Sequence, residues 1–152
     1  MTHKKTLHEA VQEFLEAHSK MVLGINENDN YPNTSLMHYA VDRSLYIHFG
    51  TKRAFGKYEA LKKDPRVSFV VVEGCIDPLR VVDGRGIARE LSSEEAEMAY
   101  LLFKTENKSK WYVEGANDFA MFQIKPTSIR WLDATSGALV KIDLDVNHKS
   151  EN

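Results

Sequence analysis

The sequence contains a single cysteine, Cys75, among its 152 residues. A lone cysteine excludes an intrachain disulfide, a cysteine-based zinc finger and a thiolate cluster, and it favours a reducing compartment. No apolar run approaches the ~18 residues that a membrane helix needs, and the charged first residues do not resemble a secretory signal. We therefore expect a cytoplasmic protein that does not enter a membrane.

Excess charge of one sign is also missing, because 20 Lys and Arg residues stand against 22 Asp and Glu residues. This balance excludes a nucleic-acid binder that relies on bulk positive charge. What is present is an ordinary globular composition, with 43% hydrophobic and 10% aromatic residues, which argues against disorder. We expect one domain over residues 1–146, large enough for a sizeable core, followed by a polar tail over 147–152.

Three helices are predicted from capping signals and apolar periodicity. Thr6 and Ser92 are each followed by Glu three residues later, which is the spacing of a capping box at a helix start. An apolar stripe follows Thr6 as far as about residue 18. A shorter helix is expected over 54–63, with Phe55 facing inward, and Pro65 stops it because proline disfavours helical geometry in the preceding residue.

Strand patterns dominate the rest of the chain. Runs rich in β-branched and aromatic residues occur at 21–25, 35–41, 45–49, 67–72, 79–90, 119–124, 128–132 and 138–144. They do not alternate with helices, so a parallel doubly wound sheet is not expected. Gly84 and Gly86 inside one strand pattern predict a bulge or a close approach by another backbone or a ligand. The fold class predicted is an antiparallel sheet or barrel with helices packed outside.

Two of these strands, 35–41 and 45–49, are predicted to form a hairpin around a loop at 42–44. That loop would place His38 opposite His48, and a slip in register would break the pairing. Because no third ligand is suggested by spacing, we favour hydrogen-bonded strand histidines over a metal site.

The segment Gly50-Thr-Lys-Arg-Ala-Phe-Gly-Lys carries the clearest chemical signal. Two cations, Lys52 and Arg53, stand where a strand ends and a helix begins, which is unfavourable unless an anion is bound. Free backbone N–H groups, the Thr51 hydroxyl and a guanidinium would together hold a phosphate. Lys57, four residues after Arg53, would share its helical face. A solvated helix start explains the same residues, so the spacing leaves both interpretations open.

Two tryptophans and the cysteine lead to weaker predictions. Trp131 lies in a strand pattern, so a place in the core or at a subunit interface is expected. Trp111 lies in a polar segment, where an exposed indole would indicate a ligand or partner. Cys75 has no histidine nearby in sequence, and the chain lacks the Gly-x-Ser-x-Gly elbow, so nucleophilic catalysis is not indicated.

Taken in order, these segments resemble the pyridoxamine 5′-phosphate oxidase-like, FMN-binding split-barrel family. The resemblance is carried by Leu45-Tyr-Ile-His-Phe-Gly-Thr-Lys-Arg, by the stretch 57–71 with its Asp-Pro-Arg-Val turn, and by the later strands 82–88 and 122–131. The general-stress and nitroimidazole-resistance-like branches are more similar than the pyridoxamine phosphate oxidases, whose basic C-terminal substrate segment has no match here. The resemblance implies a six-stranded antiparallel split β-barrel that forms a homodimer.

The resemblance also implies a function and a set of site residues. It implies an FMN-binding flavoprotein, with oxidoreductase activity on a small-molecule substrate; a non-catalytic flavin- or haem-binding carrier or sensor is the alternative, and haem or a deazaflavin could replace FMN. No catalytic residue, metal or nucleic acid is implied. The phosphate would be held by Thr51, Lys52, Arg53 and Lys57, and the flavin would be lined by Met37, His38, Tyr39, His48, Phe49 and Gly50.

Overall fold

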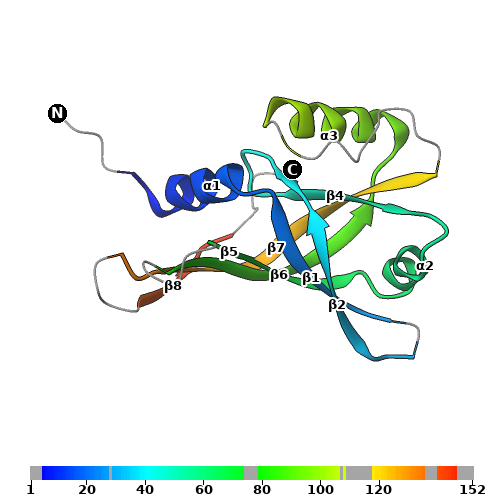
Figure 1. The fold of residues 1–152 in the computed structure, drawn as a ribbon, viewed down its shortest axis with the longest axis horizontal. Helices are drawn as coiled ribbons and strands as arrows, with labels where there is room; N and C mark the ends of the chain where they lie inside the picture. Colours follow the sequence, from blue (N-terminus) through cyan, green and yellow to red (C-terminus); the bar gives the residue numbers. More distant parts are fainter. Residues whose placement is uncertain are drawn as a thin grey trace.

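The computed structural model describes residues 5–27, 29–73, 79–106, 108, 118–135 and 140–146. In these residues one curled antiparallel sheet is flanked by three helices (Figure 1). The elements are α1 (Leu7–Ala17), β1 (Lys20–Asn26), β2 (Pro32–His38), β3 (Ala40–Val41), β4 (Ile47–Lys52), α2 (Gly56–Lys63), β5 (Arg66–Val72), β6 (Arg80–Glu90), α3 (Ser93–Thr105), β7 (Phe119–Asp133) and β8 (Val140–Leu144). The mainly β class with flanking helices is confirmed.

The strands follow the order β2-β1-β5-β6-β7-β4-β3, and β8 pairs with the far end of β7. Alternate side chains of β1 and β5 are buried and exposed, as a sheet with one covered face requires. The core fills the concave face, and α1 adds Val11, Phe14 and Leu15 to it. A smaller cluster lies between α3 and the start of β7, where Phe103 packs with Met121.

Thr6 and Ser92 both cap helix starts, as predicted. The Thr6 hydroxyl accepts a hydrogen bond from the backbone N–H of Glu9 at 3.1 Å. In α3 the bonds are reciprocal, because Ser92 accepts from the backbone N–H of Glu95 and the Glu95 carboxylate accepts from that of Ser92. None of the described helices is long and apolar enough to cross a membrane.

A single long strand, β7, replaces the two strands predicted at 119–124 and 128–132. The sequence suggested a break at Pro126, but the proline lies where the β6–β7 register shifts beside Gly86. Such an irregularity tolerates a residue that cannot donate to the ladder. A side chain on Gly84 would meet the Ser128 carbonyl oxygen at 2.4 Å, so the predicted close approach of backbone is confirmed.

The predicted hairpin register is wrong by two residues. His48 lies opposite Ala40, whereas His38 pairs with Lys20 of β1. The reason is the loop, which is closed by the Asp42 N–H bond to the Tyr46 carbonyl and contains Leu45 in the left-handed region, at φ 66°. Leucine rarely adopts this conformation, but its side chain is only 2% exposed, and this burial offsets the backbone cost.

The start of α2 also differs from the prediction. The helix begins at Gly56 rather than Ala54, because a turn closed by the Phe55 N–H bond to the Lys52 carbonyl precedes it. Phe55 was expected to face inward, but it is the N-cap residue and is 53% exposed.

Trp131 lies in the core, as predicted, with an edge-to-face contact to Phe14 at 5.2 Å between ring centroids. Predictions for Trp111, Cys75 and the tail at 147–152 concern positions outside the described residues.

Candidate functional site

The candidate site lies where β2 and β4 diverge. Residues 32–38 pair with β1, but after Tyr39 the chain pairs with β4 instead, through Ala40 and Val41. The described ladder with β4 stops at the Ala40–His48 pair. Beyond it the end of β2 and the end of β4 follow different ladders, and these are the two segments that the family resemblance assigns to the flavin.

Tyr39 fixes the point of divergence. Its backbone N–H donates to the Ser19 carbonyl at 3.1 Å, and its hydroxyl donates to the Leu15 carbonyl at 2.7 Å. The side chain is fully buried, and burial together with the charge of Glu106 raises the pKa of Tyr39 well above its usual value. The residue therefore acts as a neutral hydrogen-bond donor inside the fold.

Lys57 extends from α2 into this divergence. Its Nζ donates to the Met37 sulfur at 3.2 Å, and a thioether is a weak acceptor. The lysine is half-buried, and burial lowers its pKa while the charge of Glu27 acts in the opposite direction. Its ammonium group is therefore partly removed from water without a strong acceptor among the described residues.

Two further groups near this point can donate hydrogen bonds. The Thr51 side chain on β4 is 3% exposed, and its hydroxyl has no hydrogen-bond partner within the described parts of the chain. The N-cap side chain of α2, Phe55, forms no capping hydrogen bond, so the first N–H groups of the helix depend on other acceptors. Together with Lys57, these donors are suited to an anion.

Lys52 and Arg53 point to a different neighbourhood. The Arg53 guanidinium donates to the Phe119 carbonyl at 2.8 Å and lies 3.4 Å from a Glu90 oxygen. Lys52 lies 4.0 Å from the Asp118 carboxylate. Because α2 starts only at Gly56, Arg53 and Lys57 do not share a helical face, contrary to the sequence prediction. Of the four predicted phosphate ligands, Lys52 and Arg53 therefore have acidic partners, whereas Lys57 contacts Met37 and the Thr51 hydroxyl has no hydrogen-bond partner in the described parts of the chain.

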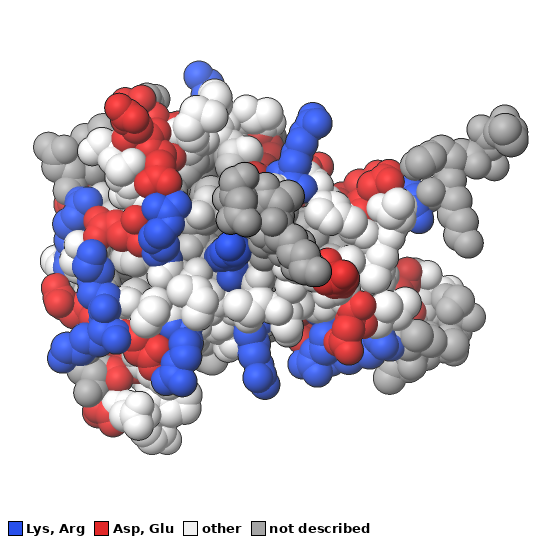
Figure 2. Space-filling model, turned by 180° about the vertical axis from the view of Figure 1, so that it is seen from behind, with Lys and Arg blue, Asp and Glu red and all other residues white. Residues whose placement is uncertain are grey.

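Glu90, at the end of β6, organises the second group. Its carboxylate accepts from the Tyr58 hydroxyl at 2.8 Å and from Lys62 at 2.9 Å, and it pairs with Arg53. Burial opposes its ionisation, but the hydrogen bonds from Lys62 and Tyr58 outweigh burial and hold the pKa of Glu90 below its usual value. On this side of the molecule, at the left of Figure 2, basic and acidic side chains lie next to each other.

The remaining predicted residues differ in how accessible they are. His38 is half-buried, and burial and the charge of Lys20 lower its pKa. His48 is 6% exposed, and its Nε2 lies 3.1 Å from the Asp42 carboxylate. Phe49 is fully buried and stacks on Phe122 at 5.5 Å, while Gly50 pairs with Met121 in the β4–β7 ladder.

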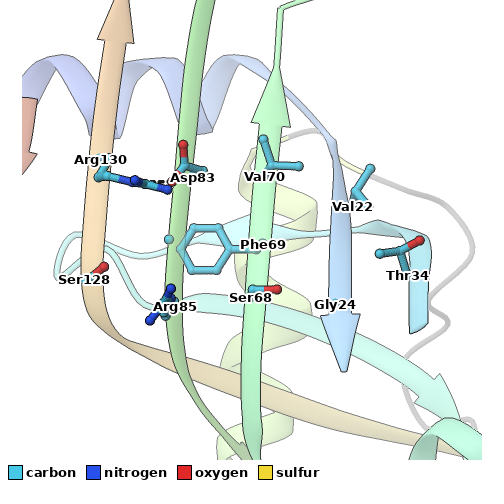
Figure 3. A pocket seen from close by; sticks show the side chains of 11 residues that line it. Val22, Gly24, Thr34, Ser68, Phe69, Val70, Asp83, Arg85, Ser128 and Arg130 are labelled. Atoms are coloured by element: carbon cyan, nitrogen blue, oxygen red, sulfur yellow. Dashed lines mark hydrogen bonds and ion pairs between the residues drawn. The ribbon is translucent and has the colours of Figure 1, made fainter. Parts of the chain in front are cut away.

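A shallow groove of about 410 Å³ crosses the outer face of the sheet (Figure 3). Gly24 lies on its floor, where a side chain would meet the Ser68 hydroxyl. Asp83 and Arg130 form an ion pair at 2.8 Å on one side. On the other side lies an outer apolar patch, defined by four residues that share this face: Val22, Leu36, Val70 and Val72.

The outer apolar patch is exposed in the single chain. Leu36 is 66% exposed, Val72 is 51% exposed and Val22 is 38% exposed. Leu36 directly precedes Met37, whose side chain points to the opposite face of β2. The outer apolar patch and the candidate site therefore lie on opposite faces of β2.

Comparison with known proteins gives one family match. The sequence pattern of a family described as pyridoxamine 5′-phosphate oxidase matches residues 7–133. No curated protein matches the chain.

Several solved structures share the fold. A heme binding protein from Mycobacterium smegmatis aligns over 93% of this chain with a TM-score of 0.73 and 15% identity, and the chain spans 59% of that protein. General Stress Protein 26 from Bacillus anthracis aligns over 90% of this chain and 98% of its own, with a TM-score of 0.65 and 16% identity. An F420 reductase aligns over 78% and 94%, with a TM-score of 0.62 and 20% identity. Likeness at these identities shows the fold alone.

Replacing Glu90 tests its organising role. We expect Glu90→Gln to lower the free energy of unfolding by about 1–3 kcal/mol at pH 7, because hydrogen bonds to a charged acceptor are weakened. A carboxyl group with a lowered pKa stabilises the folded state above its ordinary pKa of about 4.3, and this contribution is lost as pH falls. The difference from wild type, measured by denaturant unfolding, should therefore shrink toward pH 3. Glu97→Gln, on the exposed side of α3, is the control; an equal effect there would contradict the assignment.

Proposed function

Because the chain belongs to the pyridoxamine 5′-phosphate oxidase family, we propose that it is an FMN-binding flavoprotein with oxidoreductase activity on a small-molecule substrate. The observation that carries this proposal is the half-buried ammonium group of Lys57, which donates to the Met37 thioether. FMN supplies electron-transfer chemistry through its isoalloxazine ring when it is bound. The residues of the chain bind and orient that ring.

We assign the phosphate of FMN to Lys57, in the first turn of α2, and to Thr51 on β4. A phosphate is a far stronger acceptor than a thioether, and charge-assisted hydrogen bonds are about twice as strong as neutral ones. It would also accept from the buried Thr51 hydroxyl, whose lack of a partner in the described structure is otherwise costly. Lys52 and Arg53 add positive charge at the same end of β4, although Glu90 neutralises part of it.

The flavin ring is assigned to the two segments that diverge, 37–39 and 48–50. Met37 and His38 lie at the end of β2, and Gly50 lies on β4. Tyr39 and Phe49 are fully buried in the single chain, so their role is to position these strands from the core. The Asp42–His48 pair anchors the base of the same hairpin.

We further propose that the outer apolar patch forms the interface of a homodimer. Contiguous exposed apolar surface on a folded domain is typical of an interaction site. Because Leu36 and Met37 point to opposite faces of β2, a second subunit on this face would be separated from the proposed cofactor site by that strand.

Binding of FMN tests the cofactor assignment. The purified chain is mixed with FMN, freed of excess ligand and examined by visible absorption and flavin fluorescence. We expect retained, quenched flavin, with Lys57→Met weakening binding by roughly 10- to 150-fold, the equivalent of ~1.5–3 kcal/mol for a charged hydrogen bond. Lys63→Met removes the same charge from the exposed far end of α2 and should change affinity less than twofold. Equal binding by both variants would contradict the Lys57 assignment.

The same spectrum separates the other cofactors. A Soret band would indicate haem, the ligand named for the similar Mycobacterium smegmatis protein. Retention of a deazaflavin instead of FMN would indicate the cofactor class named for the similar F420 reductase. Either result would replace FMN as the cofactor.

Turnover distinguishes an oxidoreductase from a carrier. We expect NADH or NADPH to bleach the bound flavin absorbance and an added electron acceptor to restore it, because a flavin exchanges electrons with both kinds of partner. The measurement is anaerobic absorbance at the flavin band, with free FMN as the control. A flavin that stays oxidised with every donor would favour the non-catalytic carrier or sensor.

Disrupting the outer apolar patch tests the homodimer. Leu36→Glu places a charge in the middle of the patch and should convert a dimer to a monomer, because an unpaired buried charge is strongly disfavoured. Mass measurement by light scattering after size exclusion gives the oligomeric state. Met98→Glu, at a residue that is 65% exposed on α3, should leave a dimer intact. A wild-type protein that is already monomeric at micromolar concentration would contradict the proposal.

A further inference from the structure

Glu27 brings a negative charge to the start of α2. It follows the end of β1, and its side chain is half-buried. Its Oε2 lies 3.9 Å from the place that a Cβ atom would occupy on Gly56, the first residue of the helix. The carboxylate is also close enough to Lys57 to act on its charge, although no ion pair joins the two within the described residues.

The backbone around Glu27 holds it in this position. Its N–H donates to the Tyr31 carbonyl at 2.9 Å, and its own carbonyl accepts from the Asn30 N–H at 2.8 Å. Asn30 adopts a left-handed conformation, at φ 63°, which asparagine tolerates better than most residues. The neighbouring Asn26 donates to Asp64 at 3.0 Å, just after α2. The loop therefore fixes the backbone of Glu27, and Asn26 connects the end of β1 to the residue that follows α2.

A carboxylate at the start of a helix is favourable by itself, because it meets the partial positive charge of the helix end. Here it also compensates part of the charge of Lys57. An anionic ligand at Lys57 would meet the same helix end and would therefore be close to Glu27. Two negative charges near each other in a partly dry site repel, and the repulsion grows with the charge of the ligand.

We propose that Glu27 is a specificity-determining residue, which lowers the affinity of this site for dianionic phosphate relative to ligands with less negative charge. The proposal rests on the proposed function, because it concerns the phosphate end of the same FMN site. Glu27 takes the place of an anion when the site is empty and opposes the second negative charge of a phosphate monoester when the site is filled. The phosphate-free flavin, riboflavin, does not meet this repulsion.

The test compares FMN with riboflavin in wild type and Glu27→Gln by fluorescence titration at pH 8, where a phosphate monoester with a second pKa of about 6 is a dianion. We expect Glu27→Gln to bind FMN roughly three- to thirtyfold more tightly, the span of charge effects at partly buried helix ends. Riboflavin affinity should change less than twofold. Adding inorganic phosphate with riboflavin shows whether free phosphate occupies the same place, and Glu27→Gln should increase its effect.

Two control variants keep the result interpretable. Glu27→Asp retains the charge and should bind FMN as the wild type does. Glu59→Gln makes the same charge change at an exposed position of α2 and should have a smaller effect than Glu27→Gln. Circular dichroism and thermal melting confirm that each variant is folded.

The outcomes separate this inference from the proposed function. Normal FMN binding that weakens in Lys57→Met but is unchanged in Glu27→Gln would overturn the role of Glu27 and leave the proposed function standing. An equal gain for FMN and riboflavin would also overturn it, because the effect would then not depend on the phosphate. Absence of FMN binding in wild type and in every variant would overturn both.

Discussion

The change of partner at Tyr39 is the constraint on which the rest of this structure depends. One continuous stretch of chain leaves the β1 edge of the sheet and joins the β4 edge within a few residues, so the curled sheet is closed by the chain itself. Tyr39 has no partner in either ladder. Its backbone N–H and its hydroxyl instead donate hydrogen bonds to the carbonyl groups of Ser19 and Leu15. Because the strands on either side belong to different ladders, they must separate, and the separation creates the candidate site.

Charge is distributed around this separation in an unequal way. Arg53 and Lys62 are balanced by Glu90, and Arg66 is balanced by Asp64. These pairs lie at the two ends of α2. Lys57 differs from these cations, because its ammonium group donates to a sulfur atom of β2 and not to a carboxylate. Arg53, Lys62 and Arg66 have carboxylate partners, so the weak acceptor at Lys57 makes its partner a functional question.

The sequence predicted those helices and strands that are determined by residues close together in the chain. The capping boxes at Thr6 and Ser92 depend on residues three positions apart, and the alternation in β1 and β5 follows from burial of one sheet face. The left-handed Leu45 could not be predicted, because its backbone cost is offset by burial among residues distant in sequence. The hairpin register failed for the same reason.

The candidate site was predicted in part. Residues 50–57 were identified from chemistry at a helix start, and their role in binding phosphate stays a prediction. Two carboxylates in this region were missed: Glu90, 37 residues after Arg53, and Glu27, at the end of a strand that shows no chemical motif. Neither has a spacing signal, since each reaches α2 only through the tertiary structure. A charge inventory of strand ends would have identified both as candidates.

The length of β7 has a consequence for how the chain reaches this structure. Its first half completes the ladder of β4 and its second half receives β8, while β6 runs along nearly all of it. β4 ends at residue 52 and β7 begins at residue 119. β4 can therefore pair with β7 only after most of the polypeptide has been synthesised. Contacts between residues so far apart slow folding, because a long loop must close before they form. On the ribosome, the candidate site would therefore be among the last parts of the domain to assemble, and a cofactor would find its binding surface only after nearly the whole chain had been made.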